Sequence, residues 1–145
     1  MPIQDTIGSS YPTRMTAGYA GMVASGANHD VISKVVETAA VAFGLAVGRG
    51  TADGSVKLAG TGFEGITVDD KTRSADSYAV GEYAAVIRHG EVWVTAGASV
   101  APSDTVYFAA ATGVISNISA GGTAITGAKF MDTASSGAPV RVYLP

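Results

Sequence analysis

The stretch Tyr83-Ala84-Ala85-Val86-Ile87-Arg88-His89-Gly90-Glu91-Val92-Trp93-Val94-Thr95-Ala96 gives the clearest indication of the fold. Apolar, β-branched and aromatic side chains dominate on both sides of His89-Gly90, as is typical of β-strands. Two residues between such runs predict a tight β-hairpin. The stretch therefore predicts an antiparallel sheet at the centre of the chain.

The predicted hairpin divides its side chains between two faces, because side chains alternate along a strand. The apolar face would hold Tyr83, Ala85, Ile87, Val92, Val94 and Ala96. The opposite face would hold Ala84, Val86, Arg88, Glu91, Trp93 and Thr95. Tryptophan is enriched among interface hot spots, so we expect Trp93, the only tryptophan, to lie beneath the N-terminal segment or a partner subunit. The alternative is that a bulge or second sheet buries it within its own domain.

Short β-type runs, separated by Gly, Asp, Ser and Pro, continue on both sides of this stretch. They cover residues 45–49, 56–59, 63–68, 105–109, 129–131 and 140–144. Residues 116–127 are mostly small and are expected to form a loop, and the charged residues 69–76 a solvated connection. Many short strands with frequent turns predict an all-β fold, a compact antiparallel sandwich or barrel.

Residues 31–43 fit two secondary structures. Their apolar positions follow helical spacing behind Asp30, which could cap a helix. Against a helix, β-branched residues occupy many of these positions, and such side chains favour strands. We favour a strand here.

Residues 1–30 predict an extended N-terminal arm, followed by one β domain over residues 31–145. The arm is rich in small residues, and its only charges are Asp5, Arg14 and Asp30. It also carries apolar side chains that a purely solvated tail does not need, namely Ile3, Ile7, Tyr11, Met15, Tyr19 and Met22. The arm could order on a neighbouring subunit or lie across its own domain, and the sequence does not choose between them.

Composition limits the possible functions. Charged residues make up 14% of the 145 positions, well below the roughly 25% of typical globular domains. Either partner proteins cover much of the surface, or the loops are simply rich in Ala, Gly, Ser and Thr. The net charge of −3 provides no basic patch for nucleic acid. The absence of cysteine excludes disulfides and thiolate chemistry.

No group of residues predicts catalysis, a metal or a cofactor. His29 and His89 are far apart and lack metal-ligand spacing. No serine lies in a Gly-x-Ser-x-Gly motif. The longest apolar stretch, residues 39–47, is about half the ~20 residues of a membrane span, and the N-terminus lacks the pattern of a secretory signal. We therefore expect a soluble protein that is not an enzyme and has no membrane partner.

Several blocks resemble, in order and spacing, the structural cement proteins of tailed bacteriophages. The blocks are 32–37, 43–47, 63–68, 81–86, 90–94, 100–107 and 127–130. The resemblance implies a jelly-roll-like β domain, homodimers placed over symmetry axes, and contacts to the major capsid protein on the outer capsid surface. It implies no catalytic residues. Such a protein would be made in the host bacterial cytoplasm.

The expected partner-binding residues lie in the arm and on the Trp93 face of the hairpin. They are Tyr11, Arg14, Met15, Tyr19, Met22, Val86 and Trp93. Two other functions remain open. One is a different virion module, such as a tail, fibre-base or adhesive domain. The other is a small ligand-binding β domain that stacks its ligand on Trp93 with Tyr83 or Tyr107.

Overall fold

The computed structural model describes residues 18–145, and within this range the chain forms strands and no helix. The strands are β1 (Asp30–Val36), β2 (Val41–Ala42), β3 (Ala46–Arg49), β4 (Ser55–Lys57), β5 (Thr61–Thr67), β6 (Ser77–Tyr78), β7 (Tyr83–Thr95), β8 (Thr105–Ala109), β9 (Ile115–Ser116), β10 (Gly122–Phe130) and β11 (Pro139–Leu144). The all-β prediction is confirmed.

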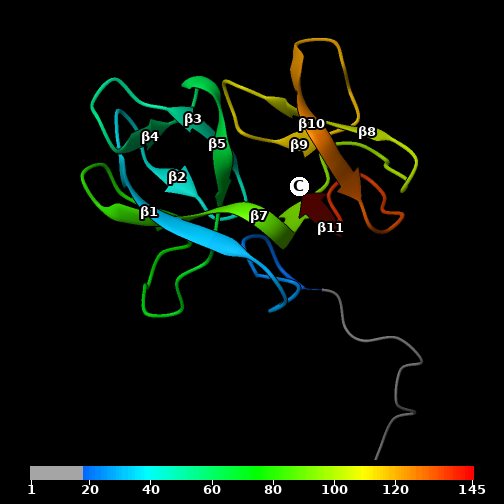
Figure 1. The fold of residues 1–145 in the computed structure, drawn as a ribbon, viewed down its shortest axis with the longest axis horizontal. Helices are drawn as coiled ribbons and strands as arrows, with labels where there is room; N and C mark the ends of the chain where they lie inside the picture. The colour runs from blue at the N-terminus through cyan, green and yellow to red at the C-terminus, as the bar shows by residue number, and fades with distance from the viewer. Residues whose placement is uncertain (1–17) are drawn as a thin grey trace, which may run out of the picture.

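Five strands of the first part of the chain close into a small barrel. Its order is β1-β4-β3-β5-β7, and β7 pairs with β1 to complete the ring (Figure 1). The predicted antiparallel barrel has one parallel strand pair, since β1 and β4 run parallel, with Val35 beside Ser55. The barrel is therefore mixed.

The second half of β7 pairs with β11, and the sheet extends from there in the order β7-β11-β10-β8-β9. A parallel bridge between Ala96 and Ile115 brings β9 back toward the end of β7. The two halves of the fold lie side by side in Figure 1 and share β7. The jelly-roll topology implied by the resemblance stays a prediction.

The predicted hairpin at His89-Gly90 is wrong, because β7 runs through both residues as one strand of 13 residues. The pairing with β1 shifts here: Asp30 lies opposite His89, but Val31 lies opposite Ile87. Gly90 has a φ of 118°, and a Cβ there would approach the Cβ of His29 to 2.8 Å. The glycine therefore permits a close approach of two segments next to a β-bulge and does not form a turn.

The first half of β7 buries side chains on both of its faces. Val86 and Ile87 are consecutive, yet both have an exposed fraction of 0%. Val86 packs in the barrel core with Val36, Val47 and Tyr78, whereas Ile87 packs in the larger core of the second half. The expectation that Val86 shares an accessible face with Trp93 is therefore wrong.

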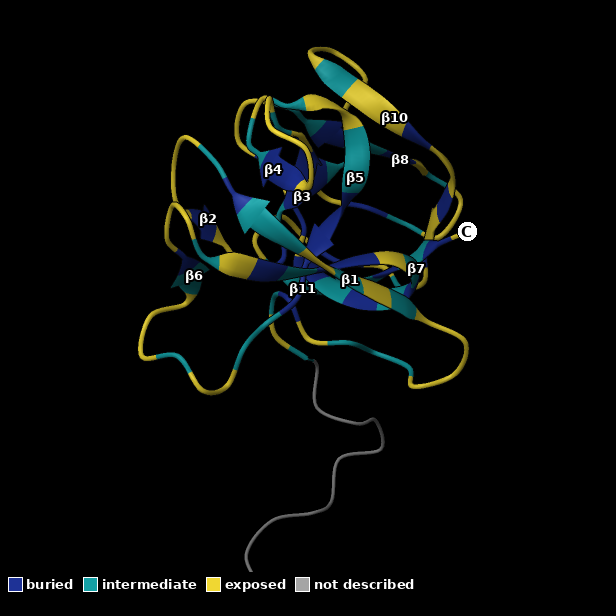
Figure 2. Cartoon of the chain, turned by 60° about the vertical axis from the view of Figure 1, so that its left-hand side comes forward, coloured by how far each residue is buried: buried dark blue, intermediate teal, exposed yellow. Residues whose placement is uncertain are grey.

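The other local predictions had different outcomes. The preference for strand over helix in residues 31–43 is confirmed by β1 and β2. The expected loop at residues 116–127 is wrong for its second half, because β10 begins at Gly122. Figure 2 shows that much of β10 is exposed, so small side chains form a strand here without needing to fill a core.

Candidate interaction surface

The last described part of the arm lies along one edge of β7. The Gly21 N–H donates to the Trp93 carbonyl at 2.8 Å, and the Trp93 N–H donates to the Met22 carbonyl at 2.8 Å. Val23 forms an antiparallel bridge with Val92. This part of the arm therefore lies across its own domain, as one of the two alternatives expected.

Trp93 lies beneath the start of this segment. Its side chain is half-buried, and a Cβ added to Gly18 would lie only 2.5 Å from the indole Cδ1. On another side, the guanidinium of Arg141 lies 5.9 Å from the ring centroid. Two hydrogen bonds of 2.8 Å from Arg141 to Asp132 fix this guanidinium and raise the pKa of Arg141. The indole is thus held between the arm and an anchored cation.

Exposed apolar side chains surround the place where the arm meets the domain. Tyr19 is 43% exposed and Met22 is 37% exposed. The Tyr19 hydroxyl donates to Asp69 at 2.8 Å, and the ammonium of Lys71 lies 3.8 Å from the Tyr19 ring centroid. Hydrogen bonding to Tyr19 raises the pKa of Lys71, with Asp69 contributing. We refer to Tyr19, Met22, Lys71 and Trp93 as the arm-root surface.

A shallow pocket of about 480 Å³ lies beside Tyr19. Its wall includes Phe43 and the charged side chains of the connection between β5 and β6, Asp69, Asp70, Lys71, Arg73 and Asp76. The arm-root surface therefore combines aromatic, apolar and charged groups in a small area, as the contact regions of interfaces do.

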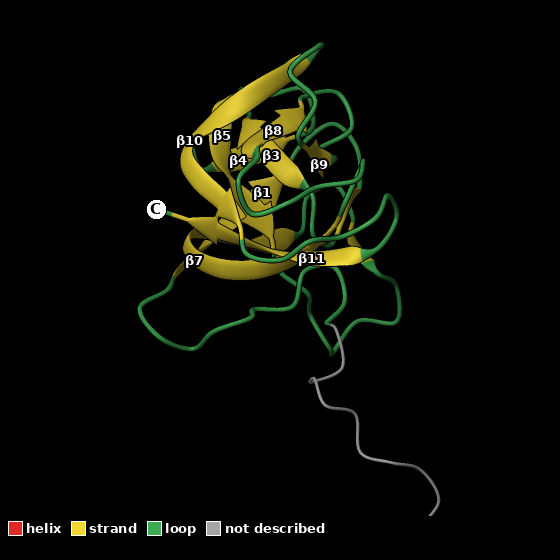
Figure 3. Cartoon of the chain, turned by 90° about the vertical axis from the view of Figure 1, so that its right-hand side faces the viewer, coloured by secondary structure: helices red, strands yellow, loops and turns green. Residues whose placement is uncertain are grey.

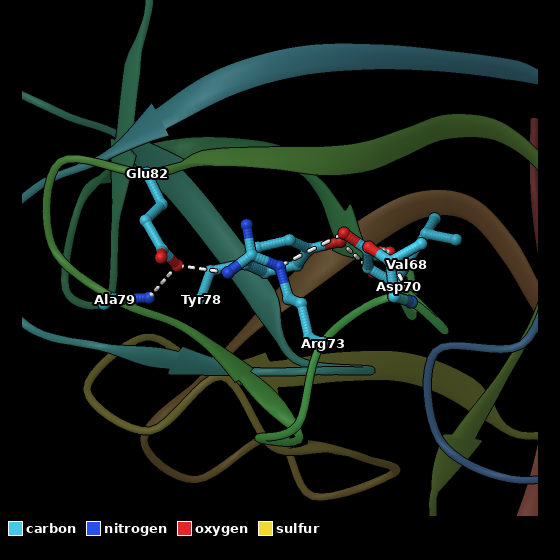
Figure 4. A network of polar contacts seen from close by, with 7 residues as sticks. Val68, Asp70, Arg73, Tyr78, Ala79 and Glu82 are labelled. Carbon is cyan, nitrogen blue, oxygen red and sulfur yellow. Dashed lines mark hydrogen bonds and ion pairs between the residues drawn. The ribbon is translucent and has the colours of Figure 1, made fainter.

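A network of polar contacts holds the connection from residue 69 to residue 82 (Figure 4). Arg73 donates to Asp70 at 3.2 Å and also bonds Glu82, and its guanidinium lies 4.6 Å from the Tyr78 ring centroid. The buried Tyr78 hydroxyl donates to the Val68 carbonyl at 2.5 Å. The charged residues 69–76, predicted as a solvated connection, are thus largely exposed but firmly anchored.

The network also shifts the pKa values of its acidic and phenolic groups. The Ala79 N–H, which donates to Glu82 at 2.8 Å, lowers the pKa of Glu82, and Arg73 lowers it further. The Thr72 hydroxyl and N–H lower the pKa of Asp70. Burial raises the pKa of Tyr78. Both carboxylates are therefore stabilised in their ionised form.

Replacing Glu82 with glutamine is expected to lower the melting temperature at pH 7 by a measurable amount. The pKa of Glu82 in the folded protein lies below its ordinary value of 4.5, so the ionised group stabilises the fold above pH 4.5 and loses this effect as the pH falls further. The difference in melting temperature between Glu82→Gln and the wild type should therefore become smaller below pH 4.5. Thermal melting followed by circular dichroism at several pH values measures it.

Asp53→Asn is the matched control, because Asp53 is fully exposed and bonds Arg49 at 3.4 Å. It should melt like the wild type at each pH. If the difference in melting temperature between Glu82→Gln and the wild type stays constant from pH 7 to pH 3, ionised Glu82 does not stabilise the fold as described.

The structure brings together three of the expected partner-binding residues, Tyr19, Met22 and Trp93. Val86 is buried in the barrel core and does not reach the surface. The other three, Tyr11, Arg14 and Met15, lie outside the described residues. Sequence reasoning missed Lys71 and Arg141, since nothing in the pattern shows that the one lies over Tyr19 and the other beside Trp93.

Within residues 18–145, no three His, Asp or Glu side chains lie close enough together to hold a metal ion. No helix in this range could cross a membrane. The features that stand out are contact surfaces, so fold and site define a class of small β-barrel interaction proteins.

The family model described as "Structural cement protein (E217 gp24/Pam3 gp6)" matches residues 7–144. The chain therefore belongs to the phage structural cement protein family. The protein is thus a non-enzymatic structural component of a phage capsid, which it stabilises. The match begins within the arm, so the family resemblance extends further toward the N-terminus than the blocks from residue 32 onward.

Solved structures share the fold. A chain in the capsid of Myoviridae phage XM1 matches with a TM-score of 0.71 and 21% identity, over 93% of this chain and 94% of that chain. The N base of head fiber gp8.5 in bacteriophage phi29 matches with a TM-score of 0.50 and 11% identity, over 81% of this chain and 95% of that one. A search of curated proteins gave no match.

Proposed function

We propose that this protein binds the outer surface of the capsid and joins neighbouring major capsid protein subunits through the arm-root surface. We propose that the arm residues Tyr11, Arg14 and Met15 also bind the capsid. The observation that carries the proposal is the half-buried Trp93, which lies under the arm with Tyr19 and Met22 exposed nearby. An aromatic anchor with an apolar border is typical of interface hot spots.

Cementing of this kind requires binding and no chemistry. A protein that binds only the assembled shell shifts the equilibrium toward that shell. Bridging two subunits adds an interface that must break before the shell opens, and repetition over the capsid multiplies weak contacts. A homodimer would present two arm-root surfaces, which suits bridging. Within the family, the sequence blocks suggest a relation to the cement protein of a short-tailed Bordetella phage.

Sedimentation with capsids tests the proposal. Purified protein is mixed with expanded capsids that lack it, in its full-length form and without residues 1–17. This deletion removes only residues outside the described range. We expect the full chain to sediment with the capsids and the shortened chain to bind at least about tenfold more weakly. Failure of the full chain to sediment would overturn the proposal.

A second candidate is a base on which another virion protein stands. The fold similarity to the head fiber base of phi29 favours it, and this similarity concerns the fold alone. A reconstruction of the virion decides between the two: a cement bridges capsid subunits with nothing attached above, whereas a base carries further density on its outer side.

A further inference from the structure

The first half of β10 leaves one of its edges open. β10 pairs with β8 at residues 122–124 and again at Lys129, but with β11 only at Lys129 and Phe130. Within residues 18–145, no residue from 125 to 128 is paired in the register of either neighbour. Figures 2 and 3 show β10 reaching beyond the adjacent strands. The side of β10 opposite β8 is therefore available to another strand over residues 123–126.

The β10 residues along this edge carry none of the side chains that usually prevent strands from pairing with other chains. Native edges carry charged side chains or proline, or are covered. Residues 122–128, with the sequence Gly-Thr-Ala-Ile-Thr-Gly-Ala, have neither charge nor proline. An open edge without such protection is a suitable place for an added strand.

A pocket of about 300 Å³ lies directly beside the open edge. Its apolar part is formed by Phe63, Ile125 and Leu144, and Ala124, Thr126, Pro145 and Arg88 complete the lining. In β-augmentation, main-chain hydrogen bonds hold the added strand, and a pocket for alternate side chains selects it. The edge and the pocket together form what we call the strand slot.

We propose that the strand slot receives residues Thr6–Ser10 of a second copy of this chain, with Ile7 in the pocket. Thr6-Ile7-Gly8-Ser9-Ser10 is uncharged and free of proline, and lies between Asp5 and Pro12. It therefore matches an uncharged edge next to a single apolar pocket. The proposal rests on the proposed homodimer and leaves Tyr11 to Met22 for the capsid.

The direction of the arm favours a second copy over the same chain. Ala24 pairs with Glu91, and Gly21 and Met22 pair with Trp93, so the arm, followed toward its N-terminus, runs away from Arg88 and the strand slot. In Figure 1 this segment lies below β7, whereas the free end of β10 lies above it. The 11 residue steps from Ile7 to Gly18 span at most ~40 Å. Reciprocal exchange of two such arms would close a symmetric dimer.

Crosslinking between separately made chains tests this arrangement, because the protein has no cysteine of its own. A chain with Ser9→Cys is mixed with a chain carrying Thr126→Cys and treated with a short bis-maleimide. The control mixture replaces the second chain with Ala52→Cys, another exposed position. We expect at least tenfold more of the mixed two-chain product with Thr126→Cys than with Ala52→Cys. Ile7→Asp in the Ser9→Cys chain should abolish this excess.

Equal yields in the two mixtures would overturn the proposal. So would a double variant, Ser9→Cys with Thr126→Cys, that crosslinks only within one chain. Wild-type sedimentation with capsids is measured in parallel. If the wild type binds capsids but the crosslink is absent, only the strand-slot proposal fails. If the crosslink forms but the wild type does not bind, the capsid-binding proposal fails.

Discussion

Replacing Trp93 with alanine is expected to weaken binding to capsids by at least about tenfold, because hot-spot residues contribute about 2 kcal/mol or more. The change removes the indole that packs against Gly18 and lies near Arg141. It therefore removes the anchor and loosens the segment bearing Tyr19 and Met22. A titration of capsids with labelled protein, followed by sedimentation, measures the affinity.

Tyr83→Ala is the matched control for this experiment. Tyr83 is 70% exposed and lies at the opposite end of β7, so its removal should leave both folding and capsid affinity unchanged. Circular dichroism is used to check that Trp93→Ala is folded. If both folded variants bind capsids as well as the wild type does, the arm-root surface is not the contact.

Replacing Gly65 with alanine is expected to destabilise the protein by about 3 kcal/mol, from steric overlap together with backbone strain. Gly65 is buried in β5 with a φ of 156°. A Cβ there would lie 2.5 Å from the Ile87 carbonyl oxygen and 2.5 Å from the Val86 Cγ1. The carbonyl belongs to β7, the strand shared by both halves of the fold, so it cannot move without disturbing both cores. Urea unfolding measures the loss.

Gly62→Ala separates the effect of steric overlap from that of backbone strain. Gly62 lies in the same strand with a φ of 65°, but nothing lies within 4 Å of the added Cβ. This variant should lose only about 1 kcal/mol, the cost of the backbone conformation. Equal losses for Gly62→Ala and Gly65→Ala would show that the approach of β5 to β7 is not as close as described.

The pattern of apolar and polar residues predicted strands well where it follows the burial of side chains. Residues 105–109 form β8 with the predicted bounds, and residues 140–144 lie within β11. Alternation could not reveal the continuous β7, since a His-Gly pair between two apolar runs fits a hairpin as well as a bulge. The difference lies in Asp30 and Val31, whose pairing with β7 depends on residues far away in the sequence.

The candidate site was only partly predictable for the same reason. The pattern singled out Tyr19, Met22 and Trp93 as unusual apolar groups, and the structure brings them together. Val86 was misplaced because alternation alone does not show that a second core, inside the barrel, covers the other face of β7 at this position. The contact of Lys71 with Tyr19 joins residues some fifty positions apart, and a charged run in a connection gives no sign of it.

The most direct test of the central claim is the temperature at which particles release their DNA. Particles are produced with the gene for this protein inactivated, and purified protein is added back to one half of the sample. A cement should raise the release temperature of the restored particles above that of the depleted ones, since its bound state stabilises only the closed shell. Equal release temperatures, with the added protein bound to the particles, would contradict the claim that this protein stabilises the capsid.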